Sequence, residues 1–558
     1  MTKQCVLCSK TFVIEPDDQV FYDKIQVPAP KLCPDCRLQR RLAWRNERSL
    51  YLRQCDLCHK NILALYPTNS PYTVYCHDCY WGDHWSSFDY GRAIDWSRPF
   101  FDQFVELYSS APHAAAYNDN PENSDYVNYC YQAKNDYLVF GSNFTENCYY
   151  CYHLDSCNQC VDCLNSDHLE LCSSCVDCSH CYNTHYAQEC HNMRDSYFCF
   201  DCRTSADCFG STGLRNKQYV LFNKQLDATT YHKQLEYYLA KNSSEQLADL
   251  ARQLRYKVPQ RPAMITKCEQ SSGDHLQNCS NAQYCFDSAE LTNCKYIIHC
   301  TPKAFDSMDV YGGGVNIERC YEFLTGYGQN LRFSMLCWKS VSNLDYCMLT
   351  NFAHDCFGCF SLRNGQYFIL NTAYNQSDYQ KLRQRLIKHM QNTGEYGEFF
   401  PIDRSIFAYN ETAAQLDFPL SSKDVIAQQW SWTEAVAMIT GQQTADITSY
   451  PQLARQTSAG LAGEIFQCQQ CQRNYKIISQ ELDFYKKQNV FLPRQCSNCR
   501  FHNLYKLRSG YHIWQRQCMC TQTGHGHHGL CMTKFETTYS PNRKEIVYCE
   551  SCYQKEIY

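Results

Sequence analysis

The chain has 558 residues, of which 20% are charged and 44% hydrophobic, and its formal net charge is −5. This composition excludes a disordered chain, and at about 100–200 residues per domain the length predicts three or more folded units. The near balance of charge gives no global field that favours or opposes nucleic acid. The sequence has neither an apolar leader nor an apolar run long enough to cross a bilayer, so we expect no secretory signal and no membrane span.

Cysteine is the unusual component, with 41 residues, many of them in C-x2-C pairs. In a secreted chain so many cysteines would favour disulfides. Repeated C-x2-C pairs at fixed separations are instead typical of metal sites, which need reduced thiols. We therefore predict a cytoplasmic protein.

Two zinc ribbons are predicted at the start of the chain, over residues 1–54 and 55–95. Zn²⁺ takes four tetrahedral ligands, and each C-x2-C turn supplies two thiolates from one knuckle. Four thiolates leave no open coordination position, so we expect structural rather than catalytic ions. The predicted ligands are Cys5, Cys8, Cys33, Cys36, Cys55, Cys58, Cys76 and Cys79.

A helical connector is expected over residues 96–119, where Ser97 is a plausible N-cap and Pro99 lies in the first turn. A cysteine-rich repeat follows over residues 120–225. Cysteine recurs there in unbroken steps of nine residues, at Cys163, Cys172, Cys181, Cys190, Cys199 and Cys208. A short fixed period indicates stacked coils, and two nonapeptides per coil would give a flattened parallel β-solenoid.

A second, degenerate β-solenoid is predicted over residues 263–375, after a helical cap or linker over 226–262. The segment "DCFGSTGLRNKQYVLFNK" from Asp207 returns 148 residues later as "DCFGCFSLRNGQYFILNT" from Asp355. The repeat cysteines are expected to be small, buried core residues. Metal storage or thiol redox chemistry is an alternative, and disulfides are a third reading.

The C-terminal region repeats the plan of the N-terminus. A helix and an aromatic connecting arm over 376–465 precede two further ribbons, over 466–517 and 518–558. Their predicted ligands are Cys468, Cys471, Cys496, Cys499, Cys518, Cys531, Cys549 and Cys552. The 24-residue gap, the step of 19 positions to the next module and the 17-residue gap match the first pair. The fourth ribbon has an insertion after Cys518. Alternative ligands within it are Cys520, His525, His527 and His528. The total implied is about four Zn²⁺ per chain.

Basic residues interleaved with aromatic ones follow Cys36 and Cys499. Guanidinium groups bind phosphate bidentately and aromatic rings stack on bases, so these stripes are candidate nucleic-acid contacts. Docking of a protein partner and internal charge pairing are the alternatives. The candidate residues are Arg37, Arg40, Arg41, Trp44, Arg45, Arg48, Arg500, Lys506 and Arg508.

The opening "CVLC…FYDKIQVPAPKLCPDCRLQRRLAWRNERSLYLRQCDLC" resembles a family of cysteine-rich zinc-ribbon proteins from candidate-phyla bacteria. The resemblance extends along the chain to "GEFFP…YNETAA" and "EIVYCESCYQKEIY". It implies zinc ligands at the cysteines named above. It implies no activity, because the family is uncharacterised beyond its ribbons. The insertion after Cys518 departs from the pattern and leaves the first ligand of that site open.

Together these features predict a mixed, β-dominated multidomain protein, with four zinc ribbons in two terminal pairs flanking two β-solenoid-like repeats. No phosphate loop, H-E-x-x-H or nucleophile elbow is present, so we expect no enzyme and no small-molecule substrate. The expected function is zinc-dependent interaction or scaffolding, with nucleic acid or a protein as partner and no membrane contact. Metal storage or thiol redox work by the repeat cysteines is the alternative.

Overall fold

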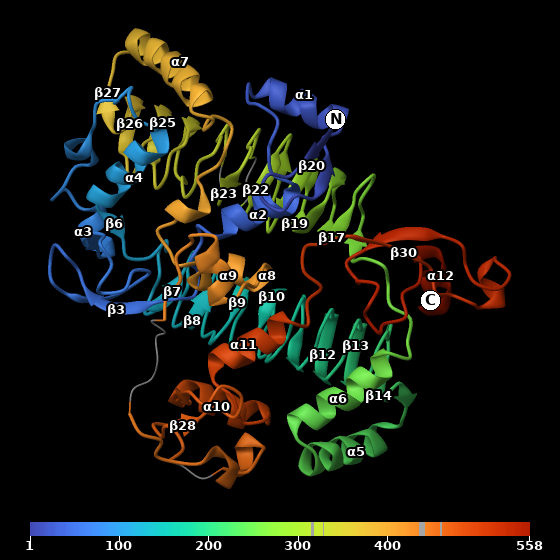
Figure 1. Cartoon of the computed structure of the whole chain (residues 1–558). Helices are drawn as coiled ribbons and strands as arrows, with labels where there is room; N and C mark the ends of the chain where they lie inside the picture. Colours follow the sequence, from blue (N-terminus) through green and yellow to red (C-terminus); the bar gives the residue numbers. More distant parts are fainter. Residues whose placement is uncertain (314–316, 327, 435–440, 458–459, 558) are drawn as a thin grey trace. The chain divides into compact units, whose positions relative to one another are not determined.

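The structure is a computed structural model that describes residues 1–313, 317–326, 328–434, 441–457 and 460–557 (Figure 1). The chain forms two compact units, and each is made of two separate stretches of sequence. The first unit comprises Met1–Ala116 and Ala263–Ala435, and the second comprises Tyr117–Pro262 and Val436–Tyr558. The N-terminal pair of cysteine modules thus shares a unit with the second repeat, and the C-terminal pair with the first. Part of the predicted arm, residues 435–440 and 458–459, lies outside the described residues.

The first unit is rich in short strands. Its helices are α1 (Pro16–Lys24), α2 (Pro34–Leu42), α3 (His77–Trp81), α4 (Phe100–Ser110), α7 (Gln376–Asn392), α8 (Ala414–Asp417) and α9 (Ser422–Ala427). Its N-terminal strands are β1 (Thr2–Gln4), β2 (Thr11–Val13), β3 (Tyr51–Gln54), β4 (Asn61–Ala64), β5 (Val74–Tyr75) and β6 (His113–Ala114). The remaining strands are β16 (Ile265–Thr266), β17 (Gly273–Gln277), β18 (Ser280–Gln283), β19 (Cys285–Ala289), β20 (Leu291–Ile298), β21 (Ala304–Phe305), β22 (Met308–Tyr311), β23 (Phe323–Leu324), β24 (Ser342–Asp345), β25 (Asn351–Phe357), β26 (Arg363–Ile369) and β27 (Thr372–Ala373).

The second unit has the same mixed character. Its helices are α5 (Ala228–Lys241), α6 (Ser244–Arg255), α10 (Ser479–Gln488), α11 (Ser497–Tyr505) and α12 (Glu550–Ile557), which brings the helices of the described residues to 12. Its strands are β7 (Tyr126–Asn128), β8 (Tyr137–Phe140), β9 (Tyr152–Asp155), β10 (Leu164–Asp167), β11 (Tyr182–His185), β12 (His191–Tyr197), β13 (Arg203–Phe209), β14 (Gln218–Leu221), β15 (Lys224–Gln225), β28 (Phe466–Gln467), β29 (Asn474–Tyr475), β30 (Trp514–Gln517) and β31 (Lys534–Thr537).

Residues 119–221 of the second unit form a stack of parallel coils, coil stack A. Successive coils pair at a step of twelve positions, as in Asp119 with Tyr131 and Tyr131 with Asn143, apart from one register shift between Tyr126 and Val127. The longer strands keep this step, since β12 pairs in parallel with β13 and His191 lies opposite Arg203. The step from one coil to the next is therefore twelve positions, and the prediction of two nonapeptides per coil is wrong.

The side chains of coil stack A follow a period of three, which explains the nine-residue spacing of the cysteines. In the central coils every third residue is buried, for example Cys148, Cys151, Leu154, Cys157 and Cys160. The residue before each of these has left-handed φ. A step of nine is a multiple of three, so recurring cysteines remain on the inside. The nine-residue spacing therefore shows which inner positions hold cysteine. It does not give the length of a coil.

The inner side chains satisfy backbone groups of their own stack. The Cys163 thiol lies 3.6 Å from the carbonyl oxygen of Val161 and 3.7 Å from that of Cys172, as a donor. The backbone N–H of Cys163 is in turn donated to the sulfur of Cys151, one coil earlier, at 3.4 Å. Serine does the same, since Ser166 donates to Leu164 and accepts from the N–H of Cys178. Inner positions therefore favour small side chains that can both donate and accept.

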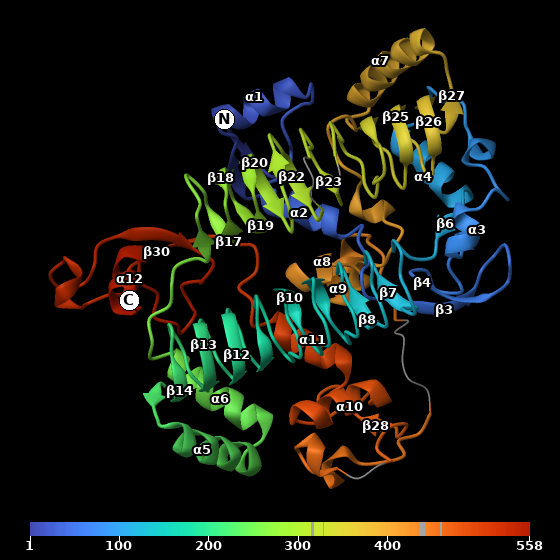
Figure 2. The same ribbon diagram turned by 180° about the vertical axis from the view of Figure 1, so that it is seen from behind.

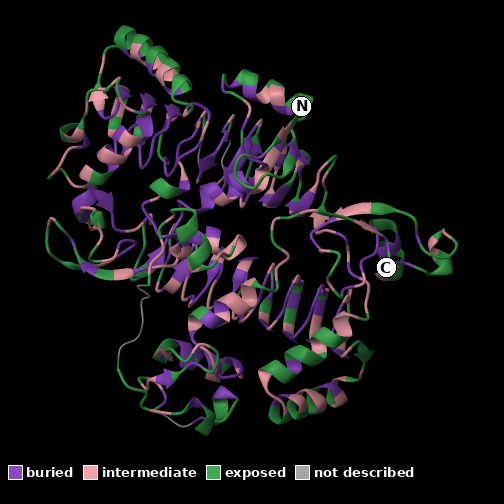
Figure 3. Cartoon of the chain, viewed as in Figure 1, coloured by how far each residue is buried: buried purple, intermediate pink, exposed green. Residues whose placement is uncertain are grey.

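In the first unit, the described residues between 265 and 369 form a second stack, coil stack B. Its strands also pair in parallel, but the step varies. Ser342 pairs with His354 twelve positions later, Leu291 with Ala304 thirteen later, and Leu324 with Met335 eleven later. Figure 3 shows buried residues recurring along the strands of both stacks. The uneven step explains why the cysteine period is poorer in this part of the sequence.

Each stack ends in a hairpin followed by helix. In coil stack A, β14 pairs antiparallel with β15, and in coil stack B β26 pairs antiparallel with β27. Helix α5 then begins after the N-cap Asp227 and packs against β14, and α7 begins after the N-cap Asn375 and packs against β26 (Figures 1 and 2). The returning strand and helix cover an edge that would otherwise leave backbone groups unpaired.

Among the described residues, the structure has no helix that is both long and apolar enough to cross a membrane.

Candidate metal centres

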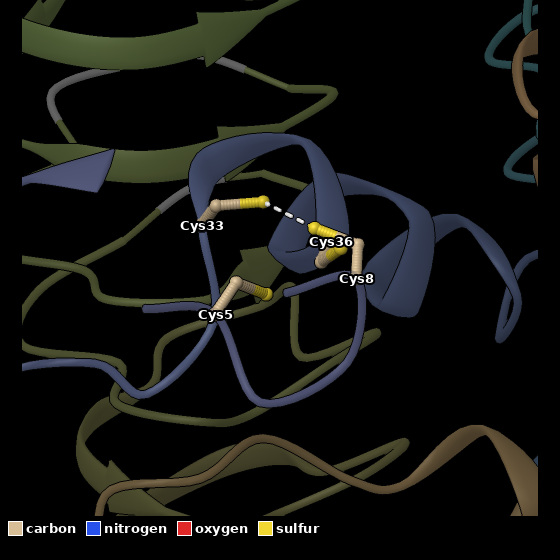
Figure 4. Close-up of side chains that lie close together, drawn as sticks. All are labelled: Cys5, Cys8, Cys33 and Cys36. Atoms are coloured by element: carbon tan, nitrogen blue, oxygen red, sulfur yellow. Dashed lines mark hydrogen bonds between the residues drawn. The ribbon is translucent and has the colours of Figure 1, made fainter. Parts of the chain in front are cut away.

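The first cysteine module brings Cys5, Cys8, Cys33 and Cys36 together (Figure 4). Cys5 and Cys8 lie in the turn between β1 and β2, which pair antiparallel. Cys33 is the N-cap of α2 and Cys36 lies in its first turn. The four sulfur atoms lie within 4.8 Å of one another, and those of Cys8 and Cys33 are 3.6 Å apart.

Two further modules have the same geometry. Cys55, Cys58, Cys76 and Cys79 form one tetrad, with 3.7 Å between the sulfurs of Cys58 and Cys76. Cys468, Cys471, Cys496 and Cys499 form another, with 3.7 Å between those of Cys471 and Cys496. Tetrahedral Zn²⁺ with Zn–S bonds of about 2.3 Å separates its sulfur ligands by about 3.8 Å. All three tetrads are therefore suited to a tetrahedral metal ion.

The thiols of a tetrad share protons unevenly. A hydrogen bond from Cys36 lowers the pKa of Cys33 to about 5, and the same contact raises the pKa of Cys36 above its usual value. Four thiolates this close repel one another unless a cation lies among them.

The fourth module contains two overlapping sets of ligand atoms. Cys518, Cys531, Cys549 and Cys552 form a tetrad within 4.8 Å, as the spacing of the first three modules predicts. Cys520, His525, His527 and Cys552 form a second set within the same limit. The structure thus brings three of the four alternative ligands together with Cys552, and His528 is exposed outside both sets.

The basic stripe after Cys36 is buried against coil stack B. The Nε of Arg37 lies 3.2 and 3.1 Å from the two carboxylate oxygens of Asp309, and its guanidinium lies 5.1 Å from the ring centre of Tyr296. The side chains of Arg37 and Asp309 are at most 2% exposed. Burial acts to lower the pKa of Arg37, but the field of Asp309 outweighs it and raises that pKa well above its usual value.

The neighbouring residues of the stripe also pair within the first unit. Arg40 binds Glu322 and Glu398, with 2.8 Å to Glu398, and Arg41 lies 3.0 Å from Asp309. Arg45 contacts Glu47 and Thr325, Trp44 donates its Nε1–H to the carbonyl oxygen of Phe400, and Arg48 is half-buried. These contacts correspond to the internal pairing alternative and occupy the faces expected to meet phosphate.

The stripe after Cys499 pairs in the same way with coil stack A. Arg500 lies 2.8 Å from Asp162 and 3.1 Å from Glu481, with its guanidinium 4.8 Å from the ring centre of Tyr150. Arg508 lies 2.9 Å from Asp177. Of the nine candidate nucleic-acid contacts, Lys506 is the exposed one.

The two docking contacts are equivalent, because both follow the fourth ligand of a module. Asp309 and Asp162 have left-handed φ values of 58° and 54° and lie one coil after the tyrosine over which the arginine stacks. These four stack residues were missed at the sequence level. Their signal was a Cys-x-Tyr in each repeat, ending at Tyr150 and Tyr296, with an aspartate one coil later.

Inner cysteines of the coil stacks donate their thiol protons to backbone carbonyl oxygens. All 41 cysteines lie within the described residues and all are free thiols. Like Cys163, the inner thiols of Cys172 and Cys337 face carbonyl oxygens of their own and the next coil.

In comparisons with known proteins, the chain matches no protein-family model, no curated protein and no solved structure.

Proposed function

We propose that this chain is a non-enzymatic, zinc-binding interaction or scaffold protein. Its terminal modules would be zinc ribbons and its coil stacks β-solenoids that act as rigid supports. The observation that carries the proposal is the set of four cysteine tetrads. In three of them a sulfur–sulfur separation of 3.6–3.7 Å matches the spacing around tetrahedral Zn²⁺. Four thiolates per ion supply a structural site with no open position.

The ion-paired arginines support a scaffold in which each ribbon pair is fixed to its solenoid. Arg37 and Arg500 come directly after a zinc ligand, so the ion would hold the helix that aims each guanidinium at its aspartate. Loss of zinc would therefore release the ribbon from the stack as well as unfold it.

Partner contacts are proposed on the outer faces of the ribbons. Val6 and Leu7, between the ligands Cys5 and Cys8, are 72% and 37% exposed, and Met532, beside Cys531, is 76% exposed. Apolar side chains next to a rigid metal site favour a protein partner over nucleic acid, because nucleic-acid contacts need free cations. The burial of the arginine stripes supports the same choice.

Metal storage or redox work by the coil cysteines is the second candidate. The hydrogen bonds from inner thiols to carbonyl oxygens, and their exchange with serine at equivalent positions, support a structural role instead.

The test is elemental analysis of gently purified protein, followed by chelation. We expect zinc alone, at about four ions per chain, one for each closed tetrad. Removal should unfold the modules while the parallel strands of the stacks persist in circular dichroism. Copper or iron, more metal than the four cysteine modules can hold, or reversible oxidation of coil thiols would favour storage or redox chemistry.

A binding assay decides the partner class. We expect no salt-sensitive binding of RNA or DNA, and Arg40→Ala/Arg41→Ala/Arg45→Ala to lower thermal stability. Tight binding that weakens steeply with salt and is lost in that triple variant would favour nucleic acid instead.

A further inference from the structure

The fourth module differs from the second by an insertion in one hairpin loop. In the second module, β3 and β4 pair up to Gln54 and Asn61, and the knuckle cysteines lie in the six residues between. In the fourth, β30 and β31 pair up to Gln517 and Lys534, and the loop has sixteen residues. The first and last cysteines of this longer loop, Cys518 and Cys531, keep the positions of Cys55 and Cys58.

The additional residues return to the metal site instead of extending away from it. The N–H of Cys531 donates to the carbonyl oxygen of Cys520 at 2.9 Å, which closes the insertion at its base. The Nδ1 of His525 lies 3.2 Å from the sulfur of Cys520, and the Nε2 of His527 lies 3.5 Å from the sulfur of Cys552. Tetrahedral Zn²⁺ bound by sulfur and nitrogen separates these atoms by about 3.5 Å.

Each imidazole has an oxygen acceptor near its second nitrogen. The Nδ1 of His527 lies 3.0 Å from the carbonyl oxygen of Gly529, so its proton is donated there and Nε2 carries the lone pair. The Nε2 of His525 lies 3.7 Å from the Glu556 carboxylate, and Lys555 donates to the His525 carbonyl oxygen at 2.8 Å. Imidazoles bound to metals are commonly held by such a carboxylate or carbonyl on the far nitrogen.

We propose that Cys520, His525, His527 and Cys552 bind a second divalent ion in the fourth module, with the Cys552 thiolate bridging this ion and the one held by Cys518, Cys531 and Cys549. Two thiolates and two neutral imidazoles suit zinc. The fourth module is then a binuclear centre, and the chain holds five ions. This inference rests on the zinc assignment of the tetrads, and it adds a site within the insertion of the fourth module.

Native mass spectrometry of the full chain counts the ions. We expect five zinc ions in the wild type, and four in both His525→Ala/His527→Ala and Cys520→Ala. His528→Ala is the matched control, because this histidine is in the same loop but in neither ligand set, and it should keep five. A wild type with four ions that these variants leave unchanged overturns the proposal.

The same experiment distinguishes two ions bridged by Cys552 from two ligand sets that compete for a single ion. If the two sets merely compete for one ion, the wild type holds four and Cys518→Ala also holds four, which overturns the bridge. Fewer than four ions, with the first three modules empty, would instead count against the zinc assignment as a whole.

Cobalt substitution supplies a second readout. Full loading should add to the absorption of four-sulfur centres a component from an S₂N₂ centre, whose d–d bands lie at shorter wavelength. That component should be absent from His525→Ala/His527→Ala and present in His528→Ala. Identical spectra for the wild type and the double variant would overturn the proposal.

Discussion

In the cysteine modules four sulfur atoms converge on one point, whereas in the coil stacks inner thiols such as Cys163 and Cys172 donate to backbone carbonyl oxygens. The sulfur atoms of Cys8 and Cys33 are 3.6 Å apart, while the thiol of Cys163 donates to two carbonyl oxygens and its neighbour Cys151 accepts an N–H. The same residue type thus solves two problems. A module too small for its own apolar core would be stabilised by a metal ion among its thiols, and a narrow coil favours a small side chain that hydrogen-bonds to the backbone.

The largest effect is expected where sulfur is a ligand. Cys33→Ser should remove the metal ion of the first module and unfold it, because structural Zn²⁺ contributes roughly 10–16 kcal/mol of apparent binding free energy in small modules. Metal content together with hydrogen exchange over residues 1–54 measures this. Retention of all ions and of protection would contradict the ligand role.

The next largest effect is expected at the contact between module and stack. Arg500→Ala should cost about 3–5 kcal/mol, since it leaves Asp162 and Glu481 buried without their cation. Arg37→Ala should cost a similar amount in the first unit because its contact with Asp309 is equivalent. Chemical denaturation measures both, and the exposed Lys506→Ala is the control. Equal midpoints for Arg500→Ala and the control would refute a docking role.

Asp136 is a carboxyl group at an inner position of coil stack A, where burial should make stability depend on pH. It accepts the N–H of Cys148 at 2.8 Å and the Thr145 hydroxyl at 2.6 Å. Burial, helped by the field of Cys148, raises its pKa to about 8. In the unfolded chain the pKa of an aspartate carboxyl group is about 4. Between the unfolded and folded pKa values the folded state binds more protons, so this group lowers the free energy of unfolding as pH rises from 4 to 8.

Asp136→Asn removes this charge and keeps an acceptor for Cys148. Its stability relative to the wild type should therefore increase from pH 4 to pH 8, as measured by thermal unfolding across that range. A difference independent of pH would show that the carboxyl group titrates normally.

The smallest effect is expected at a coil cysteine. Cys178→Ser should cost about 1 kcal/mol and leave the metal content unchanged, because Ser166 already occupies the same inner position one coil earlier. Paired with Cys33→Ser, it compares one substitution in two environments. Loss of a metal ion from the Cys178 variant would contradict the prediction that coil cysteines, unlike module cysteines, are not metal ligands.

The sequence predicted the tetrads well because ligand spacing is a local property. Cys5 to Cys8 is one turn, and the gap to Cys33 is fixed by a short hairpin and helix. The coil length was predicted poorly, because Ser166, Leu169 and Thr184 fill inner positions without belonging to the cysteine pattern. The ion pair of Arg37 with Asp309 joins residues 272 positions apart, and no periodicity in the sequence reveals such a partner.

The division of each unit into two stretches of sequence also affects the order in which its parts can fold during synthesis. When Cys79 leaves the ribosome, Asp309, on which the first module docks, has not yet been synthesised. At about 5–20 residues per second this is a delay of roughly 10–50 s. During that interval the buried face of α2, with its three paired arginines, is open to solvent. Binding of a metal ion during translation would keep α2 folded until Asp309 has been synthesised.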